Sequence, residues 1–74
     1  MFLKEKFAER IRVLRAIKKV RQHHLAELLK VTPTQISDME NAKTTTTIER
    51  LWLLADYFDV TIDYLVGRSD KPER

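Results

Sequence analysis

The sequence predicts an all-α fold, a compact five-helix bundle in a single domain, and three observations support this prediction. Apolar residues recur at intervals of three and four, which is the spacing of one face of a helix. The chain has one glycine, whereas small strand-rich folds and phosphate-binding loops need several for tight turns. Its 74 residues leave room for one domain, and the lack of cysteine excludes a disulfide framework and thiolate zinc sites.

The first two helices follow from this spacing. One is expected over about residues 3–19, and its apolar positions are Phe7, Ile11, Leu14 and Ile17. The next is expected over residues 22–29, and its apolar positions are Leu25, Ala26, Leu28 and Leu29.

The third helix has a strong start signal. Thr32 can cap it, Pro33 suits its first position, and Gln35 completes a capping box with Thr32. Ile36 and Met39, three residues apart, should then face the core.

The fourth helix is expected from about Ile48 to Phe58. Either Thr46 or Thr47 can cap it, and Thr46 with Glu49 fits a capping box. Its inner face is expected to comprise Ile48, Leu51, Ala55 and Phe58, with Leu54 alongside.

A last short helix should have Thr61 as its cap and should carry Ile62 and Leu65. The polar tail at residues 68–74 is expected to fray, so the domain would span residues 1–67.

Charge is distributed unevenly along the chain. Residues 1–30 carry nine Lys or Arg and three acids, whereas residues 31–74 carry five Lys or Arg and eight acids. A basic half beside an acidic half indicates an anionic partner for one face, although ordinary solvated helix surface would look the same. No apolar segment is long enough for a membrane span or a signal peptide, so a cytoplasmic location is expected.

The junction between the second and third helices, about three residues long, is the most informative feature. Ala26 is small enough for two helices to cross closely, and Ile36 would pack against it. The chain resembles the Cro and phage-repressor (XRE) helix-turn-helix family over about residues 7–66. The stretches that carry this resemblance are residues 10–15, 22–29, 36–43, 51–55 and 60–67. It implies a lambda-repressor-like DNA-binding domain with its motif at about residues 21–41.

The chain departs from the family pattern at several turns. Arg21 stands where relatives have Ser or Thr, which loses a cap and adds a charge. Four turns lack the glycine that relatives favour, and the residues there are Lys19, Lys30, Ala42 and Asp59. A positive φ at Lys30 would cost on the order of 1 kcal/mol.

The resemblance implies that the third helix enters the DNA major groove. Its outward positions, expected to read bases, are Pro33, Thr34, Ser37 and Asp38. The hydroxyls of Thr34 and Ser37 can donate or accept, whereas Asp38 can only accept, from cytosine N4, and repels phosphate. The alternative is that Thr34 and Ser37 are simply solvent-facing.

Phosphate contacts are expected on both sides of the reading helix. Gln22 opens its helix, so its backbone N–H and side chain can both point at a phosphate. The resemblance adds contacts after the third helix, and the full phosphate set is Arg21, Gln22, Asn41 and Lys43, with Lys19 as an addition. For Lys19 and Lys43, a simple solvated charge is an equal alternative.

A structural ion pair is also implied by the resemblance. Arg15 and Glu40 should tie the first helix to the end of the third. If the pair is buried, removing one partner typically costs roughly 3–5 kcal/mol.

Neither a metal site nor an enzyme is predicted. His23 and His24 are adjacent, so on a helix they point about 100° apart and share no face. No catalytic triad, paired carboxylates or phosphate loop is discernible, and no cofactor or small-molecule ligand is expected.

Surplus apolar surface indicates a partner. Trp52 and Leu53 are adjacent, so at most one can point fully inward. The predicted homodimer interface comprises Leu53, Tyr57, Tyr64 and Val66. The alternative is that these residues enlarge a small core.

Two functions follow from these features. The first is a bacterial or phage transcriptional regulator, expected to be a repressor, that binds a near-palindromic operator on double-stranded DNA as a homodimer. The second is an antitoxin-like or antagonist-binding module whose main partner is another protein.

Overall fold

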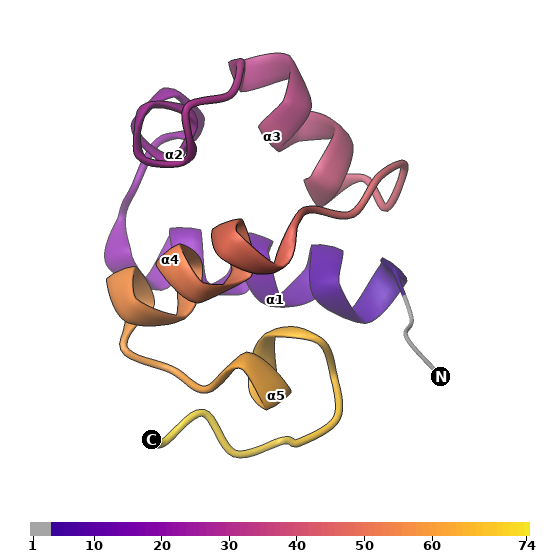
Figure 1. The fold of residues 1–74 in the computed structure, drawn as a ribbon, viewed down its shortest axis with the longest axis vertical. Coiled ribbons are helices and arrows are strands. Elements are labelled where there is room, and N and C mark those ends of the chain that lie inside the picture. The colour runs from indigo at the N-terminus through magenta and orange to yellow at the C-terminus, as the bar shows by residue number, and fades with distance from the viewer. Residues whose placement is uncertain (1–3) are drawn as a thin grey trace.

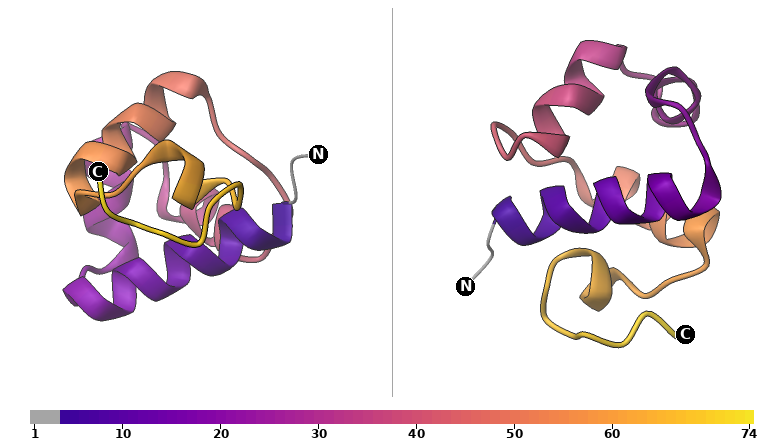
Figure 2. Two further views of the ribbon diagram at one scale, coloured as in Figure 1. Left: turned by 90° about the horizontal axis from the view of Figure 1, so that it is seen from below. Right: turned by 180° about the vertical axis from the view of Figure 1, so that it is seen from behind.

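The structure is a computed structural model that describes residues 4–74, and it confirms the all-α prediction for them. These residues form five helices and no strand. The helices are α1 (Lys4–Lys18), α2 (Gln22–Leu29), α3 (Pro33–Glu40), α4 (Ile48–Phe58) and α5 (Ile62–Leu65). Helices α2 and α3 form one end of the molecule, and α5 with the C-terminal segment forms the other (Figure 1). Helices α1 and α4 lie between these ends, as Figure 2 shows from below and behind.

One hydrophobic core joins all five helices. Its fully buried large side chains are Phe7, Ile11, Leu25, Ile36, Leu54 and Leu65. Helix α1 packs against both α3 and α5, so it links the two ends of the molecule. None of the helices within residues 4–74 has the length and apolar character needed to cross a membrane.

Side-chain caps begin three of the helices. Thr32 accepts from the backbone N–H of Gln35 at 3.1 Å, and the Gln35 side chain accepts from the Thr32 N–H at 2.9 Å, so the predicted capping box is present. Thr47, one of the two candidates, caps α4. Thr61 caps α5, as predicted.

The four turns without glycine adopt the left-handed backbone conformation. The φ angles are 57° at Lys19, 59° at Lys30, 61° at Ala42 and 55° at Asp59. Each residue ends a helix or follows its end, where this conformation returns the chain toward the core. The chain therefore adopts the left-handed conformation at four positions where the side chain adds strain.

The assignment of Ile48 to the inner face of α4 is wrong, and Ile17, an apolar position with helical spacing on α1, is exposed as well. Ile17 is 67% exposed and Ile48 is 75% exposed. Ile17 lies in the last turn of α1, and Ile48 lies in the first turn of α4. Helical spacing places both side chains on the apolar face of their helix, but a side chain is buried only where another element covers that face. No other described element covers these two turns. Trp52 and Leu53, of which at most one was expected to point fully inward, are both exposed.

The prediction that the tail frays is also wrong. Residues 68–74 fold back along α5, and the backbone N–H of Thr61 donates to the carbonyl of Pro72 at 3.2 Å. Asp70 accepts from Arg10 at 3.0 Å, and Asp56 accepts from Arg74 at 2.6 Å. Polar residues here are held by partners on distant helices.

Arg10 is the buried end of one of these contacts. It is only 6% exposed, its guanidinium carbon lies 3.9 Å from the centre of the Tyr64 ring, and its Nε has no hydrogen-bond partner among residues 4–74. Burial alone would lower the pKa of Arg10, but the neighbouring Tyr64 and Asp70 outweigh it and raise the pKa. The cation therefore stays charged beneath the C-terminal segment.

Candidate nucleic-acid interface

The outer face of α3 is the candidate reading surface. Pro33 and Thr34 are exposed, and Ser37 and Asp38 are half-buried. Thr34, Ser37 and Asp38 are separated by three and four residues, so they share one helix face. Pro33 has no N–H, so it can offer a base only apolar contact.

Asn41 closes the C-terminal end of this face. Its side-chain Nδ2 donates to the Ser37 carbonyl at 2.9 Å and to the Ser37 hydroxyl at 3.3 Å. Sequence reasoning assigned Asn41 to a phosphate and did not anticipate this contact.

Glu40 joins three helices beneath the reading face. Glu40 is only 4% exposed. Its carboxylate accepts from Arg15 Nε at 2.5 Å, from Arg15 Nη2 at 3.1 Å and from Gln22 Nε2 at 2.9 Å. The expected Arg15–Glu40 pair is therefore present in the structure. The Gln22 side chain, assigned to a phosphate, has its donor turned inward to this carboxylate.

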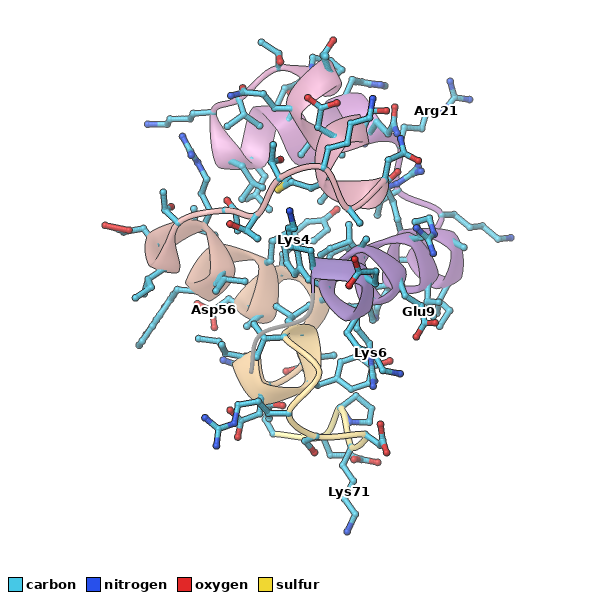
Figure 3. All side chains as sticks on the ribbon, turned by 90° about the vertical axis from the view of Figure 1, so that its right-hand side faces the viewer. Lys4, Lys6, Glu9, Arg21, Asp56 and Lys71 are labelled. Atoms are coloured by element: carbon cyan, nitrogen blue, oxygen red, sulfur yellow. The ribbon has the colours of Figure 1, made fainter. Side chains whose placement is uncertain are left out.

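Several basic side chains remain at the surface near the α2–α3 end. Arg21 precedes α2, makes no side-chain cap, and extends away from this end of the molecule (Figure 3). Lys19 and Lys43 are also exposed, one before α2 and one after α3.

Two arginines that sequence reasoning did not assign hold the motif together. Arg12 donates to the backbone carbonyl of Glu40 at the end of α3. Arg50 of α4 donates from Nε to the carbonyl of Leu29 at the end of α2, at 3.3 Å. Cations are favourable at helix C-termini, so an arginine is a suitable residue to face the end of α2 or α3. Only the tertiary structure shows that Arg12 and Arg50 lie at these helix ends.

The predicted dimer residues differ in their surroundings. Leu53 and Tyr57 are exposed on α4, and Leu53 also lines a wholly apolar hollow with Ile48, Glu49 and Trp52. Tyr64 is half-buried beneath Arg10. Val66 is half-buried and lines a separate hollow with Phe7 and Leu51.

The two histidines lie against each other. The ring centres of His23 and His24 are 4.7 Å apart with the planes tilted by 44°. Within residues 4–74, no three His, Cys, Asp or Glu side chains gather as a metal ion would require.

Comparison with known proteins identifies the family. A family model described as helix-turn-helix (HTH_3) matches residues 11–65. The uncharacterised HTH-type transcriptional regulator YobD of Bacillus subtilis (strain 168) is 28% identical over 67 residues, which are 90% of this chain and 60% of YobD.

Two solved structures share the fold. A transcriptional regulator from Listeria innocua is 38% identical with a TM-score of 0.80, covering 82% of this chain and 57% of that one. The P22 c2 repressor, crystallised with synthetic operator 9T, is 32% identical with a TM-score of 0.77, covering 85% of this chain and 96% of that one. The chain thus spans about three fifths of the length of YobD and of the Listeria protein. It belongs to the Cro/C1-type (XRE) helix-turn-helix family of transcriptional regulators.

Proposed function

We propose that this chain binds operator DNA sequence-specifically and acts as a transcriptional repressor. The observation that carries the proposal is the likeness of the whole helical domain to the P22 c2 repressor, whose structure is a complex with a synthetic operator. The polar outer face of α3 supports it, because hydroxyl and carboxylate groups can recognise base edges in the major groove. The role is binding alone, without a catalytic step or cofactor.

Phosphate contacts in this proposal flank α3. Arg21 and Lys43 are exposed on either side of the motif, and the first backbone N–H groups of α2 can donate to a phosphate. Gln22 contributes through its backbone N–H, and one of its two amide protons remains for a phosphate because the other is donated to Glu40. Asp38 adds a negative charge between these cations, so steering by charge should be modest.

The proposed active form is a homodimer on a near-palindromic operator. Reading two half-sites requires two helices about 34 Å apart, and one copy supplies a single α3. Exposed apolar side chains on α4, Leu53 and Tyr57 together with Trp52, support an interface there.

The experiment that tests DNA binding is selection from randomised duplexes followed by mobility-shift titration over a salt series. We expect enrichment of an inverted repeat and an affinity that falls linearly with the logarithm of salt concentration. Absence of salt-dependent binding to any duplex would refute the proposal.

The dimer has its own test. Leu53→Glu places a charge on the proposed interface, so sedimentation should show a monomer and binding to the full repeat should weaken. Ile17→Glu is the control, because Ile17 is also an exposed apolar residue, 67% against 40% for Leu53, and lies on another helix. If both variants dimerise like the unmodified protein, the interface lies elsewhere.

A further inference from the structure

Asn41, at the C-terminal end of α3, makes contacts that give Ser37 a defined hydrogen-bonding direction. We propose that Asn41 is a positioning residue for sequence specificity: it holds the Ser37 hydroxyl as a donor toward the base that Ser37 faces. This inference rests on the proposed function, since it needs α3 to read DNA.

The orientation of the Asn41 amide follows from its partner. Its side chain lies 2.9 Å from the Ser37 carbonyl, which also accepts from the Asn41 backbone N–H at 2.9 Å. A carbonyl oxygen can only accept, so the side-chain atom facing it must be the NH₂ nitrogen. The same nitrogen then lies 3.3 Å from the Ser37 hydroxyl oxygen.

This contact determines what Ser37 has left to offer. A neutral amide nitrogen is a donor only, so the Ser37 oxygen accepts from Asn41 and its own proton must point elsewhere. Within residues 4–74, no hydrogen bond donated by this hydroxyl is present. The proton is therefore available to an acceptor outside the protein.

In the major groove, the acceptors are guanine O6 and N7, adenine N7 and thymine O4, whereas cytosine presents the N4 donor. Asn41 fills one of the two acceptor positions of the Ser37 oxygen and leaves its proton free, so Ser37 should favour guanine or thymine, which accept, over cytosine, which donates. Its neighbour Asp38 is an acceptor only and should favour the amino group of cytosine or adenine. Two adjacent residues of α3 thus favour bases with opposite hydrogen-bonding groups, acceptors for Ser37 and donors for Asp38. From the sequence alone, Ser37 could either donate or accept.

The test measures base preference at each position of the selected operator by competition titration. The unmodified protein should prefer guanine or thymine over cytosine at the Ser37 position by about fivefold, the factor that one neutral hydrogen bond supplies. Ser37→Ala should abolish this preference. Asn41→Ala should reduce it and leave the Asp38 position unchanged.

Asn41→Asp is the decisive variant. A carboxylate oxygen cannot stay 2.9 Å from the Ser37 carbonyl, so the side chain would rotate toward the Ser37 hydroxyl, from which it can only accept. The hydroxyl would then turn inward and present only lone pairs to DNA. The preference at this position should then move toward cytosine, by about the same factor. In the Ser37→Ala background, Asn41→Asp should change no base preference.

A phosphate contact by Asn41 predicts something different. Asn41→Ala would then weaken binding equally for all sequences, as Lys43→Ala should, with base preferences unchanged. That result, or an unaltered preference in Ser37→Ala, overturns the inference while leaving DNA binding intact. Loss of all salt-dependent binding by the unmodified protein would instead refute the proposed function. Circular dichroism melts identify any variant that fails to fold. If Asn41→Ala is such a variant, Asn41→Asp compared with its Ser37→Ala double variant decides the question.

Discussion

Glu40 is the residue on which the packing of the motif depends most directly. Its buried carboxylate is neutralised by Arg15 and also holds the first side chain of α2 through Gln22. Charge and hydrogen bonding are thus satisfied by groups from two helices, which sets the position of α3 relative to both.

Replacing Arg15 by Ala should therefore destabilise the fold strongly. It leaves the Glu40 carboxylate buried with only Gln22 as a partner, and removing one member of such a pair costs about 3–5 kcal/mol. Urea unfolding measures the change. The control is Lys6→Ala, which breaks the exposed Lys6–Glu9 pair on α1 (Figure 3) and should cost no more than about 1 kcal/mol. Equal losses in both variants would contradict this account.

Lys30 is a residue at which the chain carries strain. Its φ of 59° is unfavourable for any side chain with a Cβ, so Lys30→Gly should stabilise the protein by up to about 1 kcal/mol. The same change at exposed Glu27, inside α2, should destabilise by about 1 kcal/mol, because glycine lowers helix propensity. Thermal denaturation of the two variants should show shifts of opposite sign.

At the scale of elements, the C-terminal segment is part of the fold. Residues 68–74 connect α5 to both α1 and α4 through Arg10–Asp70 and Arg74–Asp56. Gly67 makes the turn into this segment with a φ of 84°, and a Cβ there would lie 2.8 Å from the Lys6 Cβ. The single glycine of the chain is therefore needed where the backbone of the turn lies against α1.

Asp70→Ala should destabilise the protein by roughly 1–2 kcal/mol, because Arg10 would remain buried without a carboxylate. The carboxylate itself is largely exposed, which keeps the loss below that for Arg15→Ala. Lys71→Ala, at a side chain that points into solvent, is the control and should have little effect (Figure 3). Urea midpoints that coincide for the two variants would show that the Arg10–Asp70 contact contributes nothing to stability.

At the scale of the whole molecule, the net charge of +3 comes from basic residues with two different roles. Arg10, Arg12 and Arg15, three of the nine basic residues in the first thirty, use their guanidinium groups in contacts within the protein. The cations left at the surface near α2 and α3, Arg21 among them, are those that the proposed function needs. The C-terminal segment, with its own ion pairs, lies at the opposite end (Figure 1).

Arg21→Ala should weaken binding to all duplexes alike. Losing one phosphate contact should reduce the slope of log K against log salt by about 1 and leave base preferences unchanged. Mobility-shift titrations at several salt concentrations measure this. Lys71→Ala, at the opposite end of the molecule, should leave the slope as it is, and an unchanged slope in Arg21→Ala would remove this residue from the interface.

The sequence by itself determined the features that depend on near neighbours. Caps at Thr32 and Thr61 and the helix bounds arise from residues within about four positions of each other, and the short junction before Pro33 led to the family. The left-handed turns and the candidate reading positions on α3 followed from the resemblance to that family.

Only the tertiary structure decided which surfaces are covered and where side-chain donors point. Ile17 and Ile48 have helical spacing typical of a core, yet no described element lies over them. Asp70 and Arg10 are 60 positions apart, so no local pattern predicts their contact. Asn41 and Ser37 are neighbours on one helix turn, but the direction of their hydrogen bond depends on side-chain placement, and this direction is what gives the reading face its proposed specificity.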